Sequence, residues 1–198
     1  MQNLEAYLGE LGIDAGLKGV IISLSKAVVA IAEVIKTADT GKAGTSNIFG
    51  EEQLTLDLLA ENIVQGELKK NSMVGLIASE ELPEEIKLSD GLFAVCYDPL
   101  DGSSLVDVNL AVGSIFAIYK TGTFIGVKGE EQLCSMIAVY GPRTTIVLTA
   151  GHGVVEFRLN SVDEFVLSSE DLRVGEGKMF APGNLRACVD RKDYLDLL

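Results

Sequence analysis

The feature that most constrains this chain is a short buried strand followed at once by two carboxylates. Residues 92–96 form an apolar run that is too short for a helix, which indicates a buried strand. Asp98 and Asp101 then stand three residues apart, and Pro99 between them restricts the backbone on both sides. We therefore predict that the chain leaves the strand by a stiff turn, which presents both carboxylates at the strand end.

The residues after Asp101 allow a ligand to come close to the backbone. Gly102 adopts conformations that other residues do not, and Ser103 and Ser104 can open a helical turn with free N–H groups. Carboxylates beside free amides suit a hard cation that bridges to a phosphate. Asp-Pro, Asp-Gly and serine are also ordinary turn residues, so a simple strand end is the alternative interpretation.

A second acidic pair follows a second predicted strand. Residues 74–78 are apolar, and the chain then delivers Glu80 and Glu81. If the two strands are neighbours, these acids adjoin Asp98 and Asp101 at the strand ends, where ligands gather in open α/β sheets. Four clustered carboxylates repel one another unless cations lie between them, so the pattern favours a divalent metal ion.

Charge and cysteine content restrict the partners and the location. The chain has 16 Lys and Arg against 29 Asp and Glu, a net charge of -13, which argues against nucleic acid or an anionic membrane. We find no run of about 18 uncharged apolar residues and no signal-peptide pattern at the N-terminus. Cys96, Cys134 and Cys188 lack a Cys-x-x-Cys spacing, which indicates buried thiols in a reducing cytoplasm.

The first third of the chain predicts two helices. Apolar residues from Leu17 to Ile35 recur at intervals of three and four, which is typical of an amphipathic helix, and this helix is expected to end near residues 37–41. The glycines within residues 1–16 predict an irregular lead, and residues 41–47 predict a loop. A second helix is expected from about residue 50 to about residue 70.

Two acids on this second helix are interpreted differently. Asp57 lies among leucines, so it needs a hydrogen-bond partner if packing buries it. Glu61, four residues later, is interpreted as part of a solvated face.

The remainder of the chain predicts mainly β-structure. Strands are expected at residues 110–119, 124–127, 144–150 and 178–181, a hairpin at 154–167, and short helices at 130–139 and from 190. These elements predict an α/β (α+β type) layered sandwich, with two N-terminal helices packed on a mixed, mostly antiparallel sheet. The last helix stops after about two turns without a C-cap, which indicates that the chain is part of a larger protein.

Residues 98–104 resemble a string found in the class I sugar bisphosphatases, the fructose-1,6-bisphosphatases and, more closely, the sedoheptulose-1,7-bisphosphatases. Further matching segments occur in the family's order at residues 50–57, 79–81, 112–116, 140–145 and 177–187. The strings at 140–145 and 182–187 favour the sedoheptulose branch. The resemblance covers the N-terminal part of the family, so residues 1–198 would form one N-terminal domain without the C-terminal substrate domain.

The resemblance also implies roles for particular residues. Mg²⁺, with Mn²⁺ as an alternative, would be held by Glu80, Asp98 and Asp101 and by the carbonyl of Leu100. The phosphate to be cleaved would sit against Gly102, Ser103, Ser104 and Leu105. Asp57 and Glu81 would orient and deprotonate the attacking water, supported by Glu51, where the family usually has Asp.

The implied activity is Mg²⁺-dependent hydrolysis of the 1-phosphate of fructose 1,6-bisphosphate or sedoheptulose 1,7-bisphosphate. The sequence does not separate these two substrates, and without the C-terminal part the chain would be weak or inactive. The resemblance implies a homodimer or homotetramer, in the cytoplasm or, as the open alternative, a plastid. Residues 14–18 and 92–93 depart from the AMP-inhibited members, and the regulatory cysteines of plastid members are missing, so neither AMP nor thioredoxin control is expected.

Two other interpretations remain open at this point. An inositol-monophosphatase-like phosphatase shares the metal chemistry, although such enzymes usually have Ile at the position of Leu100 and Thr at that of Ser103. A non-catalytic regulatory or assembly fragment would keep the acids without binding metal. Substrate profiling separates the first alternative, and a Mg²⁺-dependent thermal shift separates the second.

Overall fold

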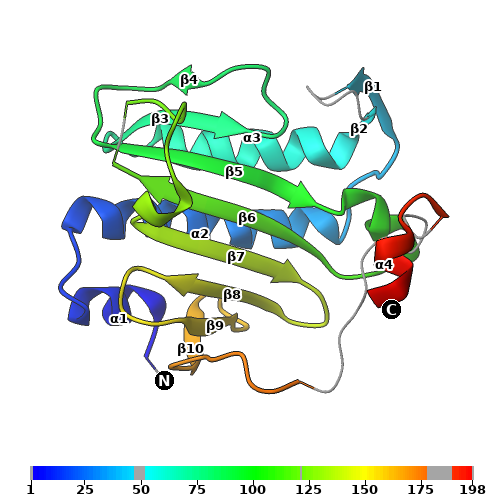
Figure 1. Cartoon of the computed structure of the whole chain (residues 1–198). Coiled ribbons are helices and arrows are strands. Elements are labelled where there is room, and N and C mark those ends of the chain that lie inside the picture. Colours follow the sequence, from blue (N-terminus) through cyan, green and yellow to red (C-terminus); the bar gives the residue numbers. More distant parts are fainter. Residues whose placement is uncertain (1, 47–51, 121, 178–188, 198) are drawn as a thin grey trace.

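A computed structural model describes residues 2–46, 52–120, 122–177 and 189–197 of the chain. Its centre is an eight-stranded sheet in the order β10-β9-β8-β7-β6-β5-β3-β4 (Figure 1). The strands are β3 (Val74–Ser79), β4 (Ile86–Lys87), β5 (Phe93–Asp101), β6 (Val112–Tyr119), β7 (Cys134–Tyr140), β8 (Thr144–Thr149), β9 (Val155–Leu159) and β10 (Phe165–Ser169).

One pair of strands in this sheet is parallel. β3 and β5 run in the same direction, with Ser79 opposite Tyr97, whereas the other pairs within the sheet are antiparallel. The C-terminal ends of β3 and β5 therefore meet at one edge. This confirms the predicted neighbourhood of the two acid-bearing strands and the mixed, mostly antiparallel sheet.

Helices α2 (Ala15–Ile35) and α3 (Thr55–Lys69) cover one face of the sheet (Figure 1). Their apolar stripes meet the inward side chains of the strands in one continuous core, which includes Val20, Leu24, Val64 and Phe116. By length and composition alone α2 could also cross a membrane, but half of its most apolar window is buried inside the protein. The predicted layered architecture is confirmed.

The N-terminal third differs from the prediction at both of its expected irregular segments. Residues Leu4–Glu10 form helix α1, because the side chain of Asn3 accepts the N–H of Ala6 (2.9 Å) and caps the first turn. The expected loop contains strand β1 (Lys42–Ser46), which pairs with β2 (Glu52–Leu54). Helix α3 consequently begins at Thr55, later than expected.

The second half contains two further corrections. Residues 130–139 are not a helix: a short 3₁₀ turn η2 (Gly129–Glu131) leads into β7. Residues 124–127 are a turn and not a strand. The expected strand at 178–181 lies outside the described residues, and helix α4 (Lys192–Leu197) agrees with the predicted final helix.

Gly75 sits at a point where β3 approaches the segment before β5 too closely for a side chain. A Cβ atom on Gly75 would lie 2.3 Å from the carbonyl oxygen of Gly91, which is backbone and cannot turn away. We expect Gly75→Ala to lower the free energy of unfolding by about 2 kcal/mol, since overpacking costs 1–3 kcal/mol. Urea unfolding followed by circular dichroism measures this loss.

Gly66 provides the matched control on α3. A Cβ atom there would meet no atom within 4 Å, and the residue is helical. Gly66→Ala should therefore raise the free energy of unfolding by about 0.5–1 kcal/mol through helix propensity. Equal effects of the two substitutions would show that the close approach at Gly75 is wrong.

Candidate metal and phosphate site

The acidic stretch lies inside β5 and does not follow it. The strand continues through Pro99 to Asp101, with an irregular register against β6 between Asp98 and Asp101. The predicted turn after residue 98 is therefore wrong; the strand bulges instead, which is where proline is tolerated within a sheet. The bulge still separates the two carboxylates from the regular ladder.

Hydrogen bonds hold the bulge in place. The hydroxyl of Ser114, which is fully buried, donates to the carbonyl oxygen of Pro99 (2.7 Å) and lies 2.8 Å from the hydroxyl of Tyr140. The backbone N–H of Leu100 donates to Oδ1 of Asp98 (3.0 Å). The backbone between the two aspartates is thus fixed by side chains from β6 and β7.

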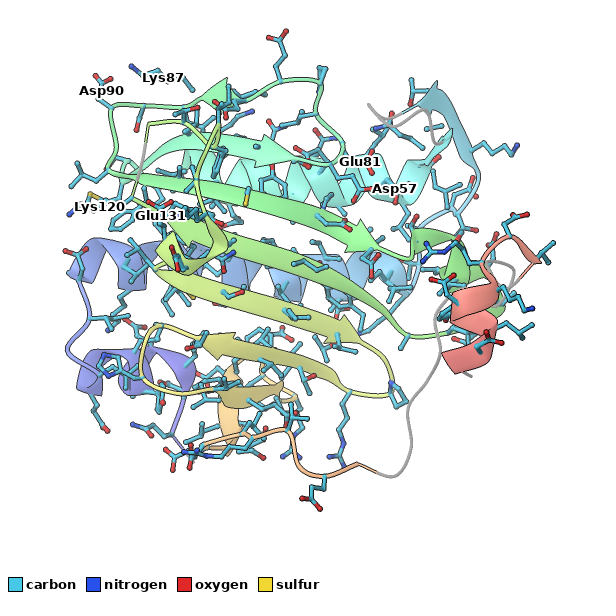
Figure 2. The ribbon with its side chains drawn as sticks, viewed as in Figure 1. Asp57, Glu81, Lys87, Asp90, Lys120 and Glu131 are labelled. Carbon is cyan, nitrogen blue, oxygen red and sulfur yellow. The ribbon has the colours of Figure 1, made fainter. Side chains whose placement is uncertain are left out.

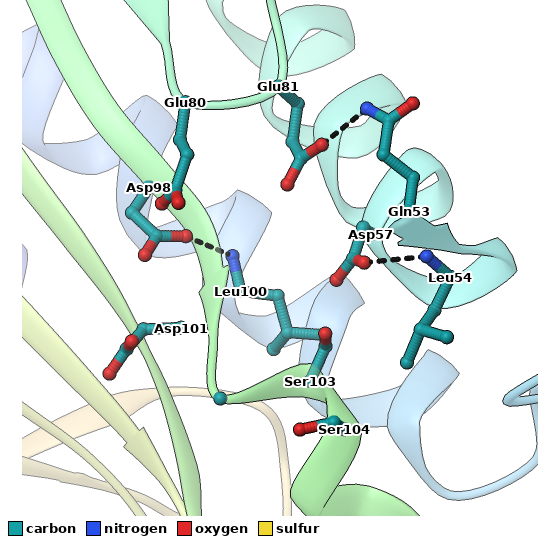
Figure 3. Close-up of a pocket in the computed structure, with 11 residues that line it drawn as sticks. Gln53, Leu54, Asp57, Glu80, Glu81, Asp98, Leu100, Asp101, Ser103 and Ser104 are labelled. Carbon is teal, nitrogen blue, oxygen red and sulfur yellow. Dashed lines mark hydrogen bonds between the residues drawn. The ribbon is translucent and has the colours of Figure 1, made fainter. Parts of the chain in front are cut away.

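A pocket of about 360 Å³ opens at the C-terminal ends of β3 and β5 (Figure 3). Its lining residues are Gln53, Leu54, Asp57, Glu80, Glu81, Asp98, Leu100, Asp101, Gly102, Ser103 and Ser104. Five of these carry carboxyl groups, and none is cationic. The structure therefore brings together every predicted site residue that it describes, except Leu105.

Asp57 and Glu81 approach the pocket from the side of α3. Asp57 is 6% exposed, and its Oδ2 accepts the N–H of Leu54 (2.8 Å) at the start of the helix, which supplies the partner that its burial was expected to require. The side-chain amide of Gln53 donates to Oε2 of Glu81. Figure 2 shows these two acids at the opposite end of the sheet from Lys87 and Lys120.

Two carboxyl groups in the pocket, Asp98 and Glu81, have pKa values that are shifted toward the neutral form. Burial raises the pKa of Asp98 to about 8, and a hydrogen bond to Glu80 and the charges of Glu80 and Asp101 act in the same direction. Burial also raises the pKa of Glu81, aided by neighbouring acids and opposed by the hydrogen bond from Gln53. The proton on Asp98, which Asp98 donates to Glu80 in this hydrogen bond, partly relieves the repulsion between the two side chains.

The chemistry of these donors fits a hard divalent cation. Carboxylate oxygens are the ligands that Mg²⁺ and Mn²⁺ prefer, and no cationic side chain of the lining competes with a metal ion. As placed, no three Asp, Glu, His or Cys side chains among the described residues converge as metal ligands. Metal binding would thus require the carboxyl groups to turn toward one another and the proton on Asp98 to leave.

The segment after β5 forms the floor of the pocket. Gly102 has φ +78°, which disfavours any other residue, and it leads into the 3₁₀ helix η1 (Ser103–Val108). The N–H of Leu105 already donates to the carbonyl oxygen of Gly102 (2.8 Å), and Leu105 does not line the pocket. Ser103 and Ser104 are therefore better placed than Leu105 to face a phosphate.

Two further acids from the sequence analysis, Glu51 and Glu61, are not among the described residues that line the pocket. Glu51, predicted as a supporting acid, lies outside the described residues. The solvated interpretation of Glu61 is wrong, because this side chain is only 5% exposed and is hydrogen-bonded to Tyr97, Ser79 and Gln65. Its four-residue spacing from the buried Asp57 could have indicated this, since both lie on one helix face.

Comparisons with known proteins agree with this architecture. The family model described as "Fructose-1-6-bisphosphatase, N-terminal domain" matches residues 5–170. The class 1 fructose-1,6-bisphosphatase of Syntrophotalea carbinolica is 44% identical over 189 residues, which cover 93% of this chain and 59% of the relative. The chloroplastic sedoheptulose-1,7-bisphosphatase of Spinacia oleracea is 38% identical over 201 residues, which cover 99% of this chain and 52% of the relative.

Solved structures of similar fold come from the same two kinds of bisphosphatase. A crystal structure from Toxoplasma gondii, described as a sedoheptulose-1,7-bisphosphatase, superposes with a TM-score of 0.86 at 32% identity and covers 100% of this chain and 68% of that one. The fructose-1,6-bisphosphatase of Leishmania major in its holo form superposes with a TM-score of 0.80 at 26% identity, covering 86% and 59%.

The fold and the pocket define a layered α/β protein with an acid-lined pocket at the ends of one parallel strand pair. The chain belongs to the fructose-1,6-bisphosphatase family and matches its N-terminal domain. This confirms the resemblance drawn from residues 98–104. The chain spans about 59% of the length of the first bacterial relative and 52% of the spinach relative, and both branches of the family are represented among its relatives.

Proposed function

We propose that this chain carries the metal half of a sugar bisphosphatase site, which hydrolyses the 1-phosphate of fructose 1,6-bisphosphate or sedoheptulose 1,7-bisphosphate. The observation that carries the proposal is the five-carboxylate pocket, which also includes the Gly102-Ser103-Ser104 floor. The relatives' names supply the substrate class. Neither the inositol-phosphatase-like alternative nor the non-catalytic fragment is favoured by the comparisons.

The chain's own residues divide the work. Glu80, Asp98 and Asp101, with the carbonyl of Leu100, would hold the cation. A divalent cation supplies positive charge that stabilises the charge developing on the phosphoryl and leaving oxygens.

The remaining pocket residues would handle the water and the phosphate. Asp57 and Glu81 would orient the attacking water and accept its proton, a task helped by the raised pKa of Glu81. The backbone N–H groups of Ser103 and Ser104 would donate to phosphate oxygens. We propose Glu51 as a supporting acid. Leu105 would support the phosphate segment indirectly, through the hydrogen bond from its N–H to the carbonyl oxygen of Gly102.

The proposal also covers the cation, the assembly, a second domain and the location of the protein. We propose Mg²⁺ as the cation, with Mn²⁺ as an alternative, and a homodimer or homotetramer as the assembly. Residues 1–198 would act as an N-terminal domain beside a substrate domain like that of the longer relatives, and the protein would work in the cytoplasm or a plastid. The sugar contacts would come largely from that second domain.

Thermal unfolding of the purified chain with Mg²⁺ and inorganic phosphate tests the proposal directly. Because a ligand that binds only the folded chain stabilises it, we expect the melting temperature to rise with Mg²⁺, and further when phosphate is added. EDTA should abolish both shifts. A melting temperature that is indifferent to Mg²⁺ with and without phosphate would contradict the proposed metal site.

Phosphate release from the two bisphosphates tests whether residues 1–198 need a second domain for activity. We expect residues 1–198 alone to release phosphate slowly or not at all, because we propose that the sugar contacts come largely from the second domain. Robust Mg²⁺-dependent turnover of either bisphosphate would support the activity and overturn the requirement for a second domain. The ratio of the two rates would then separate fructose from sedoheptulose specificity.

A further inference from the structure

Glu61 is a buried carboxylate that does not line the acid pocket. It lies on α3 one turn after Asp57, and 5% of its surface is exposed. Its Oε1 accepts hydrogen bonds from the hydroxyl of Tyr97 (2.9 Å) and the amide of Gln65 (2.7 Å). Its Oε2 accepts from the hydroxyl of Ser79 (2.6 Å). One side chain therefore ties the helix to the end of β3 and to the middle of β5.

The two strand residues that it holds are direct neighbours of the pocket acids. Ser79 precedes Glu80, and its hydroxyl oxygen also accepts the N–H of Glu81 (3.2 Å). Tyr97 precedes Asp98, and its carbonyl oxygen accepts the N–H of Glu80 (3.2 Å). Glu80 and Asp98 thus each directly follow a residue that is hydrogen-bonded to Glu61.

A carboxylate suits this position for a geometric reason. Its two oxygens can accept from two hydroxyls on different strands at once, and such charge-assisted hydrogen bonds are shorter and stronger than neutral ones. Stability alone gives little reason for the acid, since buried charges are costly and a well-packed apolar side chain is often equally stable. What Glu61 adds, and an apolar side chain would not, is a pair of hydrogen bonds that fixes Ser79 and Tyr97 relative to each other.

We infer that Glu61 is a positioning residue for the acid pocket: it fixes the turn at residues 79–82 against β5, so that Glu80 and Asp98 stay side by side on neighbouring strands, from where both side chains can turn toward one divalent cation. The inference rests on the proposed function, because it takes these two acids as ligands. It adds a residue that lies outside the pocket and acts through its neighbours.

Titration of Mg²⁺ into Glu61→Ala, by calorimetry in the presence of inorganic phosphate, tests the inference. We expect the Mg²⁺ affinity to fall about tenfold relative to the wild-type chain, since loss of groups that orient metal ligands costs 10–100-fold. Glu61→Gln, which keeps the shape and one acceptor oxygen, should recover part of this loss. It also serves if Glu61→Ala does not fold.

Val64→Ala is the matched control for a purely structural effect. Val64 is fully buried on the same helix and its side chain has no polar atoms, so its truncation removes packing without disturbing the hydrogen bonds of Glu61. We expect it to lower the melting temperature while leaving the Mg²⁺ affinity within about twofold of wild type, as expected for a site without shared partners.

Amide hydrogen exchange without metal provides an independent readout. In Glu61→Ala the amides of Glu80 and Glu81 should exchange faster than in Val64→Ala, because the turn loses its anchor. If both Mg²⁺ affinity and exchange match those of Val64→Ala, Glu61 is an ordinary core residue and the inference is overturned. If the wild-type chain does not bind Mg²⁺, the proposed function fails, while faster exchange in Glu61→Ala would still support the positioning of the turn.

Discussion

Asp98→Asn is expected to weaken Mg²⁺ binding by roughly a hundredfold, because affinity for hard cations follows the number of charged oxygen ligands. The same substitution should leave the metal-free chain at least as stable at pH 8. Asparagine keeps the oxygen that accepts from the N–H of Leu100, and its amide can donate to Glu80 in place of the proton on Asp98. Calorimetric titration and thermal unfolding measure the two effects separately.

Asp90→Asn is the matched control for this prediction. Asp90 pairs with Lys87 (2.7 Å) on the surface at the other end of the sheet (Figure 2), and it undergoes the same change of charge and shape. Its substitution should leave the Mg²⁺ affinity within about twofold of wild type, because an exposed charge this far away is screened by salt. Wild-type affinity in Asp98→Asn would remove Asp98 from the set of ligands.

The second large effect is a dependence of Mg²⁺ affinity on pH. The pKa of Asp98 is about 8 in the metal-free folded chain, so a proton must leave when the cation binds. As the pH is raised toward this pKa, we expect the Mg²⁺ affinity to rise by up to about tenfold for each pH unit. Above the pKa the affinity should level off. Calorimetry in buffers of different ionisation enthalpy counts the released protons.

The stability of the metal-free chain should show the opposite trend. The pKa of Asp98 rises from 3.8 to about 8 on folding, so between these values the folded chain holds a proton that the unfolded chain has lost. Raising the pH through this window therefore lowers the free energy of unfolding. Asp98→Asn should flatten both profiles, and a wild-type melting temperature that rises from pH 5 to pH 8 without metal would contradict the proton on Asp98.

The sequence predicted the helical layer of the fold well, because the long helix α2 buries only one face. The three-to-four spacing from Leu17 to Ile35 identified α2, which begins two residues earlier, at Ala15, and ends at Ile35, before the end expected near residues 37–41. β7 was missed because both of its faces are apolar. Met136 and Ala138 point into the core, while Ile137 and Val139 are 47% and 39% exposed on the other face, so no alternation was visible.

The sequence indicated which residues gather at the candidate site, but it did not indicate how the backbone holds them. Two strand ends with paired acids are a local signal, whereas the bulge at Pro99 depends on Ser114 and Tyr140, which lie on later strands. The burial of Glu61 was missed for a similar reason, because its partner Tyr97 is thirty-six positions away. Such contacts are set by tertiary packing, and a residue's own neighbourhood in the sequence does not reveal them.

The most direct measurement is anomalous scattering from a crystal of this chain soaked with Mn²⁺, which takes oxygen ligands as Mg²⁺ does and is visible to X-rays. We predict a peak in the pocket, with Glu80, Asp98 and Asp101 turned toward it. A peak elsewhere on the molecule, or a pocket without manganese in which these three carboxylates point into solvent, would contradict the account.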